Sequence, residues 1–175
     1  MNETINTLLK RRSVRSYLDK PVEQDKLELI CKAGSYAATA AGKMSPTIIC
    51  ITNKDDLDAL EKINAAVMGK DGAHPFYGAK TAILVVADGD NKNCVYDGSL
   101  VMGNLMNAAA SLGLGSCWIH RAKETFEKPE GKAFLDKWGI KGNIQGIGYL
   151  VLGYTNDPVL GDGPARKVDY IKYVK

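Results

Sequence analysis

A short basic stretch near the start of the chain carries residue types suited to binding an anion. It reads Arg-Arg-Ser-Val-Arg-Ser-Tyr over residues 11–17. If the stretch is extended, successive side chains alternate, so Arg11, Ser13 and Arg15 face one way and Arg12 faces the other. A guanidinium group presents paired N–H donors at fixed geometry, which suits a phosphate. The spacing therefore indicates a phosphate site, with a solvated basic turn as the alternative, because short motifs often match by chance.

A second candidate segment spans residues 112–121 and reads Leu-Gly-Leu-Gly-Ser-Cys-Trp-Ile-His-Arg. It follows the most hydrophobic helical pattern of the chain. From residue types alone, Trp118 is a core residue, Cys117 is a packed thiol and His120 is a lone surface histidine. The segment carries no dinucleotide fingerprint, because Gly-Leu-Gly lacks the third glycine of Gly-x-Gly-x-x-Gly. By itself it therefore predicts a strand end and no chemistry.

Together the two segments resemble the FMN-dependent nitroreductase family, whose N-terminal signature and Gly-Leu-Gly-Ser-Cys-Trp-Ile strand they match. The resemblance implies that the first segment grips the FMN phosphate and that a backbone N–H of the second faces flavin N5. In the first segment it implies cofactor contacts from Arg11, Arg12, Ser13 and Arg15. In the second it implies contacts from Trp118, Ile119, His120 and Arg121.

The resemblance extends to a loop of small residues over 36–46. The family places Pro-Ser-(small)-x-Asn-x-Gln there, lining the flavin from the partner subunit. This chain has Gly42 for the Asn and Met44 for the Gln, so both side-chain amides are missing. The resemblance therefore implies mostly backbone contacts from Ala38, Thr39 and Ala40. A plain loop is the alternative.

A basic pair in the tail, Arg166 and Lys167, stands where the family has residues that reach the FMN phosphate. A solvated tail is the alternative reading. Of the two residues, Arg166 is the better candidate.

Hydrophobic periodicity predicts one α+β domain over residues 1–175. The resemblance implies a three-layer sandwich with a central mixed sheet flanked by helices. The expected helices span 3–11, 22–34, 54–67, 95–112 and 123–138, the last with a break at Pro129. The expected strands span 47–52, 81–87, 146–154 and, on this chain or on a partner, 170–174. Helix 95–112 is apolar on nearly all sides, which indicates burial in a core or at a subunit interface.

Composition narrows the function classes. The chain has 175 residues and a formal net charge of +3, too small to indicate nucleic acid or a membrane surface. No metal site is expected, because its four cysteines form no Cys-x-x-Cys motif and no His pair accompanies them. Cys31, Cys50 and Cys117 sit among apolar residues, which indicates buried free thiols. The polar start and the lack of a membrane-length apolar run favour the cytoplasm.

The function that the resemblance implies is ping-pong transfer of reducing equivalents from NAD(P)H, through FMN, to a nitroaromatic, quinone or similar acceptor. It implies a homodimer with FMN at the subunit interface. No catalytic side chain is expected, because the flavin carries the chemistry. One alternative is a flavin-binding protein without turnover, for storage or sensing. The other is a nucleic-acid module, which the modest charge and the lack of an aromatic-basic pattern disfavour.

Overall fold

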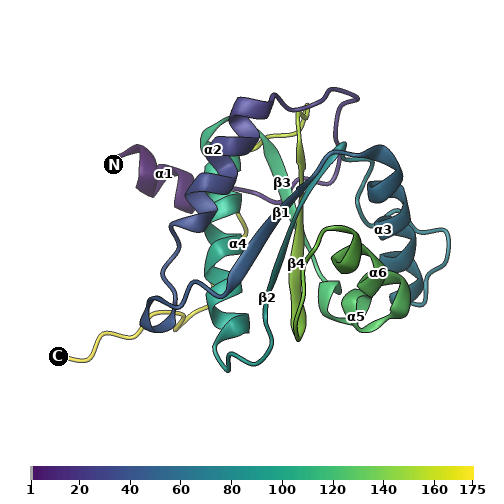
Figure 1. Ribbon diagram of the computed structural model, residues 1–175. Helices are drawn as coiled ribbons and strands as arrows, with labels where there is room; N and C mark the ends of the chain where they lie inside the picture. Colours follow the sequence, from purple (N-terminus) through teal and green to yellow (C-terminus); the bar gives the residue numbers. More distant parts are fainter. Residues whose placement is uncertain (1) are drawn as a thin grey trace.

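A four-stranded sheet between two layers of helices forms the centre of the computed structural model, which describes residues 2–175 (Figure 1). In chain order the elements are α1 (Glu3–Lys10), α2 (Gln24–Ser35), the 3₁₀ helix η1 (Ala40–Gly42), β1 (Pro46–Ile51), α3 (Lys54–Val67), β2 (Thr81–Asp88), α4 (Cys94–Ser111), β3 (Gly115–Ile119), α5 (Ala122–Glu127), α6 (Pro129–Lys137) and β4 (Ile144–Gly153). The predicted α+β class and three-layer sandwich are confirmed.

The strands run in the order β1-β2-β4-β3, and each pair of neighbours is antiparallel. The resemblance implied a mixed sheet. Among the described residues the parallel component is a single bridge, which pairs Ser13 of the N-terminal segment with Ser116 of β3. The basic stretch therefore lies beside the outer edge of β3.

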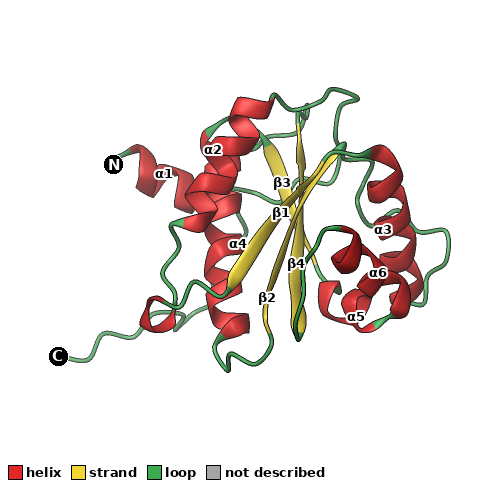
Figure 2. Cartoon of the chain, in the orientation of Figure 1, coloured by secondary structure: helices red, strands yellow, loops and turns green. Residues whose placement is uncertain are grey.

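Strand β2 is buried on both faces and divides the core in two. Ile83 and Val85 pack with residues of α2 and α4, whereas Leu84 and Val86 pack with residues of α3, α5 and α6. These two layers of helices lie on opposite sides of the sheet (Figure 2). This alternation is the period of two expected of a strand. It explains the continuous apolar run of β2, because each face of the strand packs against its own layer of helices.

Two glycines of β4 allow other elements to approach the sheet closely. A Cβ at Gly146 would lie within 2.3 Å of the carbonyl oxygen of Ala122, the first residue of α5. A Cβ at Gly148 would overlap the indole ring of Trp118 on β3. The β2–β4 register shifts between Val85 and Val86, at the same place. These glycines therefore fix how the end of β3 and the start of α5 sit on the sheet.

Two expectations about local structure need correction. Within one chain residues 170–174 form no strand, because their exposed backbone has no neighbouring strand to pair with within the described residues; a strand formed on a partner stays a prediction. Cys50, expected to be a buried thiol, is exposed at the edge strand β1, where no further strand covers it. The break predicted at Pro129 within 123–138 is confirmed: Pro129 begins α6, and Lys128 between α5 and α6 is extended.

Large apolar side chains remain exposed on α1, α4 and the C-terminal tail. Helix α4 buries much of its surface but leaves one face uncovered, on which Tyr96 is 72% exposed. Helix α1, α4 and the end of the tail lie on the same side of the sheet (Figure 1). The exposed residues are Ile5, Leu8, Leu9, Val95, Tyr96, Leu100, Val168, Tyr170, Ile171, Tyr173 and Val174. Across residues 2–175, no helix combines the length and hydrophobicity that a membrane crossing requires.

Candidate cofactor site

The basic stretch runs alongside β3 in the same direction. The Val14 N–H donates to the carbonyl of Ser116 at 3.0 Å, next to the parallel Ser13–Ser116 bridge. The Tyr17 hydroxyl donates to the carbonyl of Val14 at 2.7 Å and holds the stretch where it leaves the strand. Because the two segments are parallel, Arg11 lies toward the start of β3 and Arg15 toward its end. Four residues of extended chain separate these arginines by about 13 Å.

Two guanidinium groups lie together near the start of β3, and a third, that of Arg11, stands on the other face of the extended stretch. Those of Arg12 and Arg166 both lie against Gly163, and Arg12 Nε also donates to the carbonyl of Lys10 at 2.9 Å. Arg11 is half-buried, and its Nη1 has no hydrogen-bond partner among the described residues. Burial, followed by the charge of Arg12, lowers the pKa of Arg11. The nearby carboxylate of Asp162 is engaged by Lys10. Arg12 Nη2 donates to the carbonyl of Leu9 as well, so the unpaired donor that this end of the site offers to an anion is Nη1 of Arg11.

A pocket of about 180 Å³ lies at the other end, beyond β3. It is lined by five of the predicted site residues, namely Arg15, Trp118, Ile119, His120 and Arg121. The loop over 68–80 closes one side of the pocket through Met68, Pro75 and Tyr77, while His74 points to the surface and lies 3.5 Å from Glu61. The pocket combines guanidinium groups with aromatic walls, which suits a flat polar ring.

Tyr77 is a pocket residue that the sequence did not single out. Its φ is 54°, and the following Gly78 also has a positive φ of 74°. Such a backbone is uncommon for a bulky residue. Phe76, buried against Tyr149, and its N–H bond to Glu61 at 2.7 Å hold the loop in this conformation. An aromatic residue directly before a loop glycine was the available signal.

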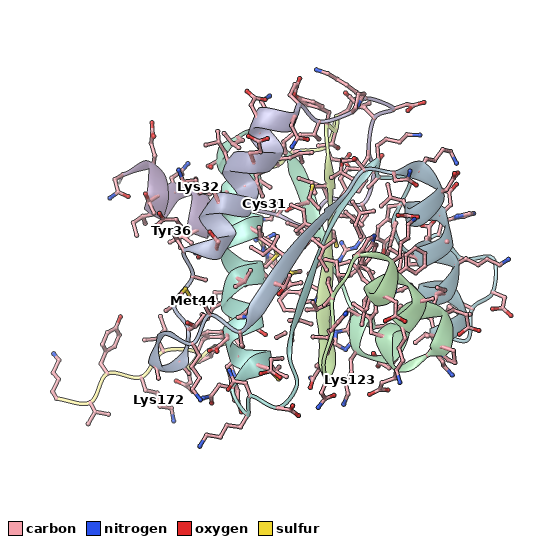
Figure 3. All side chains as sticks on the ribbon, viewed as in Figure 1. Cys31, Lys32, Tyr36, Met44, Lys123 and Lys172 are labelled. Carbon is pink, nitrogen blue, oxygen red and sulfur yellow. The ribbon has the colours of Figure 1, made fainter. Side chains whose placement is uncertain are left out.

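The loop with Ala38, Thr39 and Ala40 lies elsewhere. The Ala40 N–H donates to the buried carboxylate of Asp97 at 3.0 Å, and Thr39 Oγ1 accepts from the Met44 N–H at 3.1 Å. Tyr36 and Met44 flank this loop on the layer of α2 and α4, whereas Lys123, just past β3, lies on the opposite side of the sheet (Figure 3). One chain therefore does not bring residues 38–40 to the pocket.

The two basic residues of the tail, Arg166 and Lys167, lie apart from each other in the structure. Arg166 joins Arg12, whereas the Lys167 ammonium lies 5.5 Å from the ring centre of Tyr170. Among residues 2–175, no group of three or more His, Cys, Asp or Glu side chains is arranged to hold a metal ion. The geometry suits an elongated ligand with an anion at one end and a planar ring at the other.

Comparisons with known proteins agree with this geometry. The sequence model of the Nitroreductase family matches residues 8–154. The chain is 28% identical over 163 residues to an Archaeoglobus fulgidus protein described as a candidate NADH dehydrogenase/NAD(P)H nitroreductase, covering 90% of this chain and 88% of that one. It is 29% identical over 132 residues to the Bacillus subtilis FMN reductase [NAD(P)H], covering 66% of this chain and 53% of that one. A Bacteroides fragilis nitroreductase solved with bound FMN is 28% identical over the whole of both chains, with a TM-score of 0.89.

Proposed function

Because the chain belongs to the nitroreductase family, we propose that it is an NAD(P)H-dependent oxidoreductase with FMN as its cofactor. The observation that carries the cofactor assignment is the separation of two features. The half-buried Arg11 has an unpaired Nη1, and Arg15 lies in the ring-sized pocket. Four residues of extended chain, about 13 Å, separate these two arginines. An anion at one end and a flat ring at the other describe FMN. Riboflavin would leave the buried donor unpaired.

In this proposal Arg11, Arg12 and Arg166 hold the phosphate, with Ser13 beside them on the same stretch. Arg15 and residues 118–121 hold the ring end. Bound FMN would supply the redox chemistry, taking reducing equivalents from NAD(P)H and passing them to a small acceptor such as a nitroaromatic or a quinone. The side chains bind and orient, and none is assigned as an acid or base.

We further propose that the active form is a homodimer. The apolar residues exposed on α1, α4 and the tail lie on one side of the sheet, which is the kind of surface that a second subunit covers. The loop over 38–40 contributes nothing to the pocket of its own chain. In a dimer it can line the partner's site, as the family resemblance implies. The four free cysteines suit a reducing cytoplasm.

The purified protein is expected to be yellow and to hold about one FMN per chain. Heat should release the flavin, and chromatography should identify it as FMN. With NADH or NADPH and a quinone or nitroaromatic acceptor, the protein should oxidise the nicotinamide continuously. FMN binding without NAD(P)H oxidation would instead indicate a storage or sensing protein. If the protein is colourless as purified and stays colourless after FMN is added, the assignment is wrong.

Light scattering at micromolar concentration is expected to give twice the 18.9 kDa chain mass. Replacing the exposed Tyr96 and Leu100 of α4 by lysine should shift this mass toward one chain, because charges would enter an apolar interface. A matched double change to lysine at the exposed Ala133 and Asp136 of α6, on the far side of the sheet, should leave the mass unchanged. A wild-type monomer that binds FMN would contradict the shared site.

A further inference from the structure

Asn64 is a polar residue on the buried face of α3, where the periodic pattern of the helix otherwise has apolar residues. It continues the buried stripe of Leu57 and Leu60 on α3 and is itself 0% exposed. Burying a side-chain amide costs free energy unless its hydrogen bonds are made. A leucine at this position would satisfy the packing alone. The amide therefore requires a polar explanation.

The hydrogen bonds of Asn64 are half made. Its Nδ2 donates to the carbonyl of His120 at 2.9 Å. Its Oδ1 is buried and has no hydrogen-bond partner among the described residues. The residue lines the 180 Å³ pocket together with Arg15, His120 and Arg121. The unpaired acceptor thus belongs to a residue that lines the pocket assigned above to the flavin ring.

The carbonyl that Asn64 holds lies at a critical point of the backbone. The β3–β4 pairing ends at Ile119, opposite Tyr149, so the strand ladder does not hold His120. The next residue, Arg121, has a φ of 76° and turns the chain into α5. Asn64 thereby joins α3 to the end of β3, across 56 positions of sequence. It acts on the segment that the proposed function places against the flavin.

We propose that Asn64 is a positioning residue of the cofactor site. Its Nδ2 fixes the His120 peptide, and its Oδ1 accepts a hydrogen bond from an N–H donor of the ligand bound in the pocket. This inference rests on the proposed function. It adds that α3, and not only the two segments that resemble the family, determines how the flavin ring is held.

The test compares Asn64→Leu and Asn64→Ala with Asn104→Leu and Asn104→Ala. Asn104 is a matched control, because its Nδ2 makes the same kind of bond to a backbone carbonyl, that of Ala33, at 3.1 Å, between α4 and α2 and away from the pocket. Alanine is included because leucine can fail to fit. Each folded variant is titrated as apo protein with FMN and with riboflavin. The reduction potential and visible circular dichroism of its bound flavin are then measured.

Both Asn64 variants are expected to bind FMN and riboflavin about 3- to 10-fold more weakly, since the lost contacts concern the ring and not the phosphate. They should also shift the potential and the dichroism, which a general loss of stability would leave unchanged. The Asn104 variants should keep both spectroscopic properties. Wild-type flavin properties in the Asn64 variants, or equal shifts in the Asn104 variants, would overturn the inference alone. A wild-type protein that binds no flavin would overturn the proposed function and this inference with it.

Discussion

Replacement of Arg11 by alanine is expected to weaken FMN binding by about 10- to 150-fold, corresponding to the loss of a charge-assisted hydrogen bond of roughly 1.5–3 kcal/mol. The residue is half-buried, and its Nη1 has no partner among the described residues. Nη1 of Arg11 therefore stays without a hydrogen-bond acceptor until an anion binds. For the same reason, the thermal stability of the apo protein should not fall. The measurement is titration of apo protein with FMN, followed by flavin fluorescence.

Riboflavin provides the control, because it has the ring but lacks the phosphate. Arg11→Ala should leave its affinity nearly unchanged. Arg15→Ala should weaken both flavins alike, because Arg15 lies in the pocket at the ring end. Equal weakening of both flavins by Arg11→Ala would show that Arg11 does not bind the phosphate. No effect on either would reduce the basic stretch to a solvated turn.

Gly146→Ala is expected to lower the free energy of unfolding by about 3 kcal/mol, at the upper end for overpacking. The added methyl would lie within 2.3 Å of the Ala122 carbonyl oxygen, which is backbone and cannot rotate away. For a chain of this size the midpoint of thermal unfolding should fall by roughly 6–12 °C. Because α5 follows directly after residues 118–121, flavin affinity should fall as well. Thermal unfolding of apo protein and flavin titration measure the two effects.

Gly161→Ala is the matched control. A Cβ there would make only ordinary contacts at 4.0 Å, and the residue does not have a positive φ. Its stability should stay within about 0.5 kcal/mol of wild type. If Gly146→Ala is equally mild, the sheet tolerates movement of α5, and the glycine is not what sets the position of the β3 end.

The sequence predicted the elements well where local pattern determines them. The apolar run of β2, the amphipathic α2 and α3 and the break at Pro129 each follow from periodicity or from the missing proline N–H. The strand expected at 170–174, on this chain or on a partner, does not form within one chain, for a physical reason. Its residues favour a strand, but a strand requires a neighbour, and this chain supplies none at that place.

The site was predictable in composition but not in layout. Arg11 and Arg15 were both assigned to one phosphate, because alternation puts them on one face. Their separation along the site follows from the parallel bridge to Ser116, a contact over about a hundred residues that no local pattern contains. The bond from Asn64 to His120 is hidden in the same way. A polar residue within an apolar stripe was the only local sign of it.

The sheet order has a consequence for the newly made chain. Strand β2 is apolar from Ala82 to Ala87, and it lies between β1, which precedes it, and β4, which ends only at Gly153. During synthesis β1 and β2 can pair as soon as both exist, but the other edge of β2 stays open until most of the protein has been made. An open apolar edge invites pairing with other chains. The danger of aggregation is therefore greatest while the polypeptide is still growing, and slow translation between Asp88 and Ile144 would prolong it.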